Sequence, residues 1–519
     1  MKTITIPSFI RIACIAWMAS ICCTSCNSQN EPQKPIIIVD DSTSTFVSTR
    51  EQGMYHTFFK PQIAWVGDVM PFYDEASETF HIFYLQDWRP AAGIIHPIWD
   101  VETRDFSSYT NNREAIPLGK SYEQDVAIGT GGAIRANDGQ YHFFYTGEMA
   151  DNPDCMQAIM HATSEDLSFW TKDKLFGYMR ATEGYSPNDF RDACTFYDPD
   201  AKIYRMAVST HYHGAPAIGH YTSTNLQTWT AAAQPLVMNA PHFMECADFF
   251  KMNGRWYVTY SSISTPRCVY YRYKTGNLDD PNGWSDPQPL DGYSYYAAKT
   301  TADKQGNRYL CGWLRTLAGS HDSSGWGGAL VVHLLKCDGN GPDLICSVPQ
   351  GVYTKYTKPV KLIEQERVRT TLSNDTYTLD ASTLDRAYVQ FNRLRSPARI
   401  TCTIKRLTNT GIFGFTFAAS SDENKANHLR FILEPDNNNK ADLAHDSDET
   451  GQNNLFNIHR IRDDREYQVT ICIEKSVAVM YINDKVAFSC RIYDMENNPW
   501  QLFCESGQIE VSNLQLMTY

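Results

Sequence analysis

Runs rich in large apolar residues alternate with polar, turn-forming residues through the first two thirds of the chain. Within these runs apolar residues stand at adjacent or alternate positions, which is typical of short β-strands rather than helices. Turns rich in Asp, Asn and Gly come before the runs and predict hairpins. The runs begin at Phe80, Tyr141, Tyr204, Trp256 and Tyr309, at intervals of 61, 63, 52 and 53 residues.

A second element follows most of these runs, with Asp or Asn before Leu or Phe and an aromatic residue shortly after. It occurs as Arg104-Asp-Phe-Ser-Ser-Tyr, Glu165-Asp-Leu-Ser-Phe-Trp, Thr224-Asn-Leu-Gln-Thr-Trp and Gly276-Asn-Leu. Two elements that recur in register indicate a repeated unit of roughly 50 to 60 residues. Such a unit, built from several short strands, predicts a propeller blade, and five units predict a closed ring over residues 56–360.

The repeat stops near Lys361, and the remaining chain shows unrelated strand runs separated by turns. We expect strands at 398–407, 411–419, 428–433, 467–474, 477–482, 486–493 and 508–517. This pattern predicts a β-sandwich over residues 361–519. The predicted fold class is therefore all-β, a five-bladed β-propeller followed by a C-terminal β-sandwich.

The N-terminus has a different character. A basic and then mostly apolar stretch, too short for a comfortable membrane span, predicts an export signal over residues 1–26. Cys26 follows two small polar residues and resembles the lipidated residue of a bacterial lipoprotein, with Cys22 and Cys23 as competing candidates. Residues 27–55 are expected to be a linker. We therefore expect an exported lipoprotein of the bacterial cell envelope, periplasmic or on the outer surface, with simple secretion as the alternative.

Charge and cysteine content exclude several kinds of partner. The net charge of −13 argues against nucleic acid, because phosphate binding needs a basic face. The 15 cysteines show no zinc-type spacing, and no glycine-rich phosphate loop occurs. The 11 tryptophans and 30 tyrosines suit either sugar binding or the core of a β-protein. From the cysteines we predict no structural metal.

Three acidic residues stand at matched places in different repeats. Asp68 and Asp192 each lie 12 residues before an aromatic run, and Glu245 lies 11 residues before one. In a propeller, these places are at the starts of the innermost strands, so the side chains converge on the mouth of the channel. A carboxylate beside a buried strand is costly unless partners or function hold it there. A purely structural role, in binding strand-end amides, is the alternative for each acid taken singly.

Converging carboxylates suit glycoside hydrolysis, in which one attacks the anomeric carbon and another protonates the leaving oxygen. Crowding raises the pKa of one member and so favours its staying protonated as the acid. Arg191, next to Asp192, is placed to keep that carboxylate ionised.

The sequence resembles glycoside hydrolase family 32, the invertase, inulinase and levanase group, over most of residues 60–519. Trp65-Val-Gly-Asp resembles the family's W-M-N-D-P-N-G motif, Phe190-Arg-Asp-Ala resembles F-R-D-P, and Glu245-Cys-Ala-Asp resembles E-C-P-D. Further matches are Gly129-Thr-Gly-Gly-Ala with Tyr145-Thr-Gly, Tyr296-Ala-Ala-Lys with Gly312-Trp, and the sandwich segment starting at Glu474.

The resemblance implies a five-bladed propeller with a β-sandwich and a double displacement that retains configuration. By this resemblance Asp68 is the nucleophile, Glu245 the general acid/base and Asp192 the transition-state stabiliser. The implied substrate is an oligo- or polysaccharide of the fructan type, such as levan, inulin or fructo-oligosaccharides, and the resemblance implies no metal or organic cofactor. Further sugar-binding candidates are Arg191, Trp65, Gln86, Trp88 and Thr130.

The nucleophile motif departs from the family pattern, since Gly67 and Met70 stand where the family has Asn. Two alternatives follow. One is a carbohydrate-binding lipoprotein without catalysis, which the lost asparagines favour and the three retained acids oppose. The other is a related propeller hydrolase acting on another glycoside, such as an arabinoside.

Overall fold

The computed structural model describes residues 55–519, apart from 88–95, 153, 265–266, 317–325, 384–385, 410, 418–426, 434–439, 445–453, 456–460, 462–463 and 494–497. The predicted signal with Cys26, most of the predicted linker and the predicted sugar contact Trp88 lie outside the described residues. In the described part of the chain, no helix is long and apolar enough to cross a membrane.

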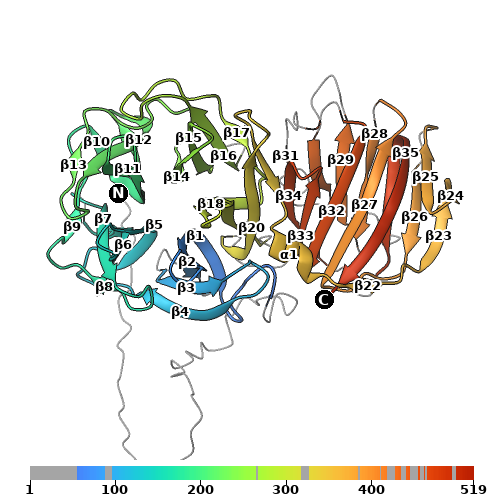
Figure 1. Cartoon of the computed structure of the whole chain (residues 1–519), viewed down its shortest axis with the longest axis horizontal. Coiled ribbons are helices and arrows are strands. Elements are labelled where there is room, and N and C mark those ends of the chain that lie inside the picture. Colours follow the sequence, from blue (N-terminus) through green and yellow to red (C-terminus); the bar gives the residue numbers. More distant parts are fainter. Residues whose placement is uncertain are drawn as a thin grey trace, which may run out of the picture. The chain divides into compact units, whose positions relative to one another are not determined.

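Five groups of antiparallel strands follow one another along the chain between residues 65 and 347, and each forms one blade (Figure 1). The last blade and the first are joined into one sheet. Blade 1 contains β1 (Trp65–Asp74), β2 (Thr79–Asp87), β3 (Ile98–Thr103) and β4 (Thr110–Ile116). Blade 2 contains β5 (Ala127–Arg135), β6 (Tyr141–Glu148), β7 (Gln157–Ser164), β8 (Thr171–Lys172) and β9 (Tyr178–Met179). Blade 3 contains β10 (Tyr185–Asp198), β11 (Ile203–Tyr212), β12 (Ala215–Ser223) and β13 (Thr230–Ala231). Blade 4 contains β14 (Glu245–Met252), β15 (Arg255–Ser262), β16 (Cys268–Lys274) and β17 (Gln288–Pro289). Blade 5 contains β18 (Tyr295–Ala302), β19 (Arg308–Arg315), β20 (Gly328–Cys337) and β21 (Leu344–Ser347).

The first strands of the blades contact one another in a closed cycle, in the order β1, β5, β10, β14, β18 and back to β1. They are therefore the innermost strands. The ring closes between blades 5 and 1, where β20 pairs with β1 through Gly328 and Val66. The backbone N–H of Leu330 also donates to the carbonyl of Phe59, at 2.8 Å. The predicted five-bladed propeller is confirmed.

The second repeated element is a turn after the third strand of a blade. In blade 2, Ser164 Oγ accepts from the backbone N–H of Leu167 at 2.9 Å, and Leu167 has a φ of 64°. In blade 3, Ser223 Oγ accepts from Leu226 N–H at 2.9 Å, with a φ of 62°. Blade 1 has the same turn at Phe106. The Asp or Asn in the motif accepts further turn amides, which explains the residue types that recur.

The short helix α1 (Gln350–Lys355) connects the propeller to the sandwich. One group of sandwich strands pairs around the second half of β35: β22 (Lys358–Val360), β24 (Thr370–Ser373), β25 (Thr376–Ala381), β27 (Ala398–Arg406), β32 (Glu466–Glu474), β33 (Val477–Ile482) and β34 (Val486–Arg491). The other group pairs around its first half: β23 (Glu364–Val368), β26 (Ala387–Phe391), β28 (Gly411–Phe417), β29 (Asn427–Leu433), β30 (Lys440–Ala444) and β31 (Asn454–Leu455).

The long strand β35 (Trp500–Thr518) belongs to both sheets. Up to Ser506 it pairs with β26 and β28, and from Gly507 it pairs with β25 and β27. Gly507 has a φ of 84°, a conformation that a side chain makes costly, so glycine is required where the strand changes sheets. The predicted C-terminal β-sandwich is confirmed.

Buried polar groups connect the two folds. The carboxylate of Asp291 accepts from the backbone N–H of Ser489 at 2.7 Å and from its hydroxyl at 2.5 Å. His333 Nε2 lies 2.9 Å from the same carboxylate, and its Nδ1 lies 3.0 Å from the hydroxyl of Tyr481. Glu474 of β32 accepts from three backbone N–H groups of residues 56–58. The sandwich therefore holds the segment that precedes β1.

Candidate active site

All five innermost strands carry a β-bulge at the same level. Each bulge places one extra residue on the inner strand, which turns side chains away from the regular alternation of the pleat. The bulges lie between Val66 and Val69, Gly129 and Gly131, Arg191 and Cys194, Glu245 and Asp248, and Tyr296 and Lys299. The three predicted acids lie in or at the edge of three of these bulges, which explains why they can meet at one end of the channel.

Asp68 is held by neutral donors. Thr130 Oγ1 donates to its Oδ2 at 2.8 Å, and the indole N–H of Trp313 donates to its Oδ1 at 3.0 Å. Burial raises the pKa of Asp68, and the charge of Asp192 raises it further, whereas these hydrogen bonds act in the opposite direction. The donors fix the orientation of the carboxylate without neutralising its charge, as a nucleophile requires.

Asp192 is hydrogen-bonded to the strand that carries Glu245. Its backbone has a φ of 60°, in the left-handed region, and its side chain is 5% exposed. Its Oδ2 accepts the backbone N–H of Cys246 at 2.8 Å, directly after Glu245. The bulges of blades 3 and 4 are therefore bonded to each other. A left-handed Asp is an uncommon and strained choice, which persists where the surroundings demand it.

Glu245 has two donors of different kinds. The hydroxyl of Tyr296 donates to Oε2 at 2.6 Å, and Arg191 Nη2 donates to Oε1 at 3.1 Å. Burial raises the pKa of Glu245, and the nearby charge of Asp192 raises it further, against the lowering by Tyr296 and Arg191. A carboxyl group with a raised pKa is suited to act as a general acid.

Arg191 lies among the acids, and its guanidinium stacks on Phe243 with 4.4 Å to the ring centroid. Burial by itself lowers its pKa, but the charges of Asp192 and Glu245 reverse the effect and raise it. Arg191 also donates to Asp189 at 2.8 Å. The arginine therefore stays charged and holds Glu245 in place.

The other predicted sugar-binding residues differ in whether they contact the three acids. Thr130 contacts Asp68 itself. Gln86 is 2% exposed and accepts from the Tyr84 hydroxyl at 3.0 Å, so its side chain is fixed within blade 1. Trp65 is also 2% exposed, with the ammonium of Lys60 4.2 Å from its ring centroid. Contact of these residues with a sugar stays a prediction.

Two functional candidates were missed from the sequence, Tyr296 and Trp313. Both lie in the motif quoted for the late repeat, and they pair across β18 and β19. Tyr296 begins its bulge at the position that Glu245 has in the preceding inner strand, and this equivalence was a usable signal. The rings of the two residues lie 5.7 Å apart, and the guanidinium of Arg267 is 4.0 Å from the Tyr296 centroid.

Both positions where the family has Asn hold no amide. Met70 is 1% exposed, and its sulfur accepts the backbone N–H of Gly131 at 3.0 Å. A side chain at Gly67 would meet the indole of Trp326, because a Cβ there would lie 2.2 Å from Cη2. The nucleophile of this chain therefore has apolar groups at both places.

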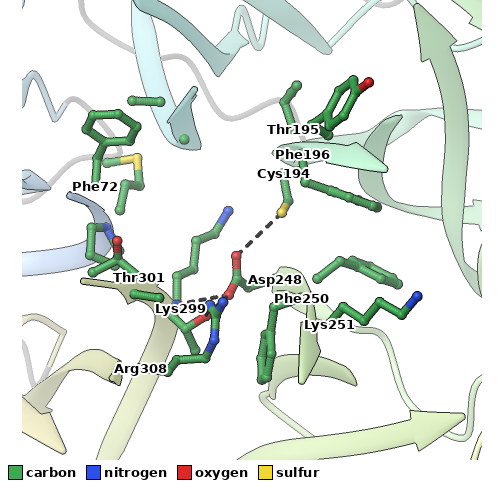
Figure 2. A pocket seen from close by; sticks show the side chains of 18 of the residues that line it. Phe72, Cys194, Thr195, Phe196, Asp248, Phe250, Lys251, Lys299, Thr301 and Arg308 are labelled. Carbon is green, nitrogen blue, oxygen red and sulfur yellow. Dashed lines mark hydrogen bonds between the residues drawn. The ribbon is translucent and has the colours of Figure 1, made fainter. Parts of the chain in front are cut away.

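Farther along the same inner strands, the channel opens into a cavity of about 310 Å³ (Figure 2). There Lys299 donates to the carbonyls of Gly131 and Ala193 at 2.9 and 3.4 Å, which joins three blades. Asp248 accepts from the backbone N–H and the hydroxyl of Thr300 at 3.0 and 2.6 Å. These polar groups form hydrogen bonds with one another across blades, so a structural role explains why they are buried here.

One group of three residues has the spacing of metal ligands within the described part of the chain: His81, Asp100 and Glu102. Arg113 donates to both carboxylates, at 2.8 Å each. The guanidinium already supplies the positive charge that a metal ion would bring, so we assign no metal there.

Several known proteins are similar to this chain. Sucrose-6-phosphate hydrolase of Vibrio alginolyticus is 28% identical over 255 residues, which are 45% of this chain and 50% of that protein. Levanbiose-producing levanase of Bacillus subtilis (strain 168) is 21% identical over 531 aligned positions, 92% of each chain. Fructan 1-exohydrolase IIa of Cichorium intybus has a similar structure, with a TM-score of 0.68, 16% identity and coverage of 91% of this chain and 98% of that chain.

The chain spans about half the length of the first curated relatives that it matches. Two family models together cover nearly all of the propeller and the sandwich. One, described as GH32, BT1760-like, C-terminal domain, matches residues 343–516. The other, described as Glycosyl hydrolases family 32 N-terminal domain, matches residues 58–339, more than half of the sequence, and the chain therefore belongs to glycosyl hydrolases family 32.

Proposed function

We propose that the chain is a retaining glycoside hydrolase that cleaves β-fructofuranosides of the fructan type, such as levan, inulin or fructo-oligosaccharides. The observation that carries the proposal is the convergence of three acids with distinct surroundings. Asp68 has only neutral donors, Asp192 is bonded to backbone, and Glu245 has a raised pKa. A purely structural role for the acids would give them strand-end amides as partners, and only Asp192 has one.

The reaction proceeds in two steps. Asp68 attacks the anomeric carbon, and Glu245 donates its proton to the glycosidic oxygen, which leaves with the rest of the sugar. Glu245, now ionised, takes a proton from water, and the resulting nucleophile displaces Asp68 from the same carbon. Asp192 accepts hydrogen bonds from sugar hydroxyls, and these strengthen as positive charge develops on the ring. The two displacements together retain configuration.

Sugar release tests the proposal directly. The chain from Asn27 onward is incubated with levan, inulin, sucrose, 1-kestose and a panel of arabinofuranosides. We expect fructose or fructo-oligosaccharides, with the anomeric configuration of the first product retained in a proton NMR time course. Release of arabinose alone would move the assignment to another furanoside and keep the mechanism. No release from any substrate, with sugar binding still present, would favour the carbohydrate-binding lipoprotein.

The relatives support fructosides over other furanosides. The similar proteins include enzymes named for sucrose-6-phosphate, fructan and levan. The Cichorium fructan exohydrolase has also been solved in complex with 1-kestose, with a TM-score of 0.69.

The pH dependence should follow the two raised pKa values. Asp68 must be ionised to attack, so activity is lost as pH falls through its pKa. Glu245 must be protonated in the first step, so kcat/KM falls as pH rises through its pKa. Tyr296→Phe removes a hydrogen bond that lowers the pKa of Glu245, so we expect the alkaline limb of the pH profile to move to higher pH. Tyr122→Phe, at a 70% exposed tyrosine, is the control. An unchanged alkaline limb would contradict the assignment of Glu245 as the acid.

We further propose that the protein is exported and anchored to the bacterial envelope through lipid on Cys26. The basis is the sequence before residue 27 alone. In a bacterial host, the parent should incorporate labelled palmitate and fractionate with membranes, and Cys26→Ser should lose both properties. Incorporation that persists in Cys26→Ser and stops in Cys22→Ser or Cys23→Ser would move the lipid to the other cysteine.

A further inference from the structure

Gly67, the residue before the proposed nucleophile, has no space around it for a side chain. The φ of Gly67 lies outside the left-handed region, so its backbone would accept a side chain. A Cβ at this position, however, would lie 2.2 and 2.7 Å from Cη2 and Cζ3 of Trp326 and 2.9 Å from the carbonyl oxygen of Leu85. Nothing larger than hydrogen fits at position 67 while the indole stays in place.

Trp326 is held in this place by rings from two blades. It precedes β20 in blade 5, and it packs against residues of blade 1. The ring of His96, just before β3, stacks on it at 4.5 Å with an interplanar angle of 14°. The ring of Trp313, whose N–H binds Asp68, lies 5.8 Å away at 55°. The indole therefore lies one ring from the nucleophile, at the seam where the propeller closes.

We infer that Trp326 is a specificity-determining residue of the glycone subsite, and that it replaces the amide side chain which family members carry at position 67. An Asn offers a donor and an acceptor to a sugar hydroxyl, whereas the edge of the six-membered indole ring offers neither. The second lost Asn is replaced by Met70, which is buried. The subsite therefore recognises its sugar by packing on an apolar wall beside the nucleophile, with fewer hydrogen bonds than an amide would provide.

This inference rests on the proposed function and refines its substrate. It indicates that the substrate is a furanoside. The ring carbon of this furanoside that faces the indole of Trp326 does not need a hydroxyl that forms a hydrogen bond with the protein. A site that hydrogen-bonds a sugar hydroxyl binds a sugar without that hydroxyl much more weakly. An apolar surface discriminates only weakly between sugars with and without the hydroxyl. The chain should therefore separate fructofuranosides from arabinofuranosides less sharply than an enzyme with Asn at this position.

Four proteins test the coupling of the two positions: the parent, Gly67→Asn, Trp326→Ala and the double variant. We expect Trp326→Ala to raise KM about tenfold with a smaller fall in kcat, because a packing contact is lost. Gly67→Asn alone should lower kcat/KM by about 100-fold, because the Asn displaces the wall next to the nucleophile. Trp326→Ala removes the two shortest contacts at position 67 and leaves the contact with the carbonyl oxygen of Leu85. The double variant should therefore exceed Gly67→Asn in kcat/KM, and it should prefer fructosides over arabinosides more strongly than the parent.

Trp229→Ala is the matched control. It removes a half-buried indole from the turn after β12, so it should lower thermal stability without changing KM. Trp326→Phe provides a milder change if Trp326→Ala does not fold. A parental KM for every sugar in both Trp326 variants would overturn the inference. So would a double variant whose kcat/KM loss equals the product of the two single losses.

A binding experiment separates this inference from the proposed hydrolysis. Calorimetry with fructose and arabinose uses Glu245→Gln with and without Trp326→Ala. If the parent releases no sugar but fructose binds and Trp326→Ala weakens the binding about tenfold, the proposed hydrolysis is contradicted and the role of Trp326 in sugar binding is supported. If the parent is active and binding is unaffected by Trp326→Ala, the role of Trp326 in sugar binding is contradicted and the proposed hydrolysis is supported. If neither sugar binds, the inference is overturned.

Discussion

Asp68→Asn should abolish sugar release, lowering kcat/KM by about 10⁴-fold or more for every substrate, because no covalent intermediate can form. The loss should come without unfolding. The pKa of Asp68 is raised in the folded protein, so its charged form is disfavoured there at neutral pH. A neutral amide removes that cost, and we expect the melting temperature to stay level or to rise.

Glu245→Gln should behave differently with different leaving groups. For natural fructosides kcat/KM should fall by about 10³-fold, because the leaving oxygen needs a proton. For an activated aryl fructoside, whose leaving group needs none, the first step should be nearly unaffected and a burst of released phenol should appear. Equal losses on both substrates would show that Glu245 is not the acid.

The matched control for both variants is Asp200→Asn. Asp200 follows β10, the strand that carries Asp192, but it pairs with Lys251 at 2.5 Å and its side chain is 65% exposed. It should keep parental activity. Parental activity in Asp68→Asn would rule out this residue as the nucleophile.

The propeller could be predicted because its blades repeat. The aromatic runs lie in the second strands β2, β6, β11, β15 and β19, which are buried on both faces over most of their length and therefore carry large apolar residues at adjacent positions. The recurring Asp or Asn marks a turn in which its side chain binds backbone amides. Both signals are local, so a single sequence carries them.

Part of the sandwich was missed for lack of such signals. The expected strands from residue 398 to the end correspond to β27, β28, β29, β32, β33, β34 and β35, whereas no strand was expected over 358–391. β22 is exposed at all three positions, and β23 and β24 are nearly so, which leaves no apolar alternation to read. β26 does alternate, with Ala387, Val389 and Phe391 buried, and it could have been found. The predicted domain boundary at residue 360 stays a prediction, with β22 pairing with β35.

The acids could be located in the sequence, and so could the residues Thr130 and Arg191, but the hydrogen bonds that these residues donate to the acids could not. Matched spacing before each aromatic run placed Asp68, Asp192 and Glu245 at equivalent levels of the ring. The groups that bind Asp68 and Glu245 are neutral or come from other blades, as Trp313 and Tyr296 do. Their contacts depend on ring closure and on the bulges, which are properties of three-dimensional packing rather than of local sequence.

The second large effect is a loss of stability, expected from a change at the junction between the propeller and the sandwich. Asp291→Ala should destabilise the protein by about 3 to 4 kcal/mol, because buried donors of both folds lose their acceptor. Asp291 and Ser489 are fully buried, as is His333, so water cannot easily replace the carboxylate. We expect the urea midpoint to fall and the single unfolding transition to divide, as the propeller and the sandwich become less strongly coupled.

The junction also offers its own control. Asp338 of the propeller pairs with Lys485 of the sandwich at 3.3 Å, but both side chains are about one third exposed. An exposed pair contributes less than about 1 kcal/mol, so Asp338→Ala should leave the urea midpoint nearly unchanged. Asp291→Asn, which keeps one acceptor oxygen, should fall between the parent and Asp291→Ala. If Asp291→Ala and Asp338→Ala shift the midpoint equally, burial at this junction does not determine its strength, and the coupling must come from the apolar contacts around it.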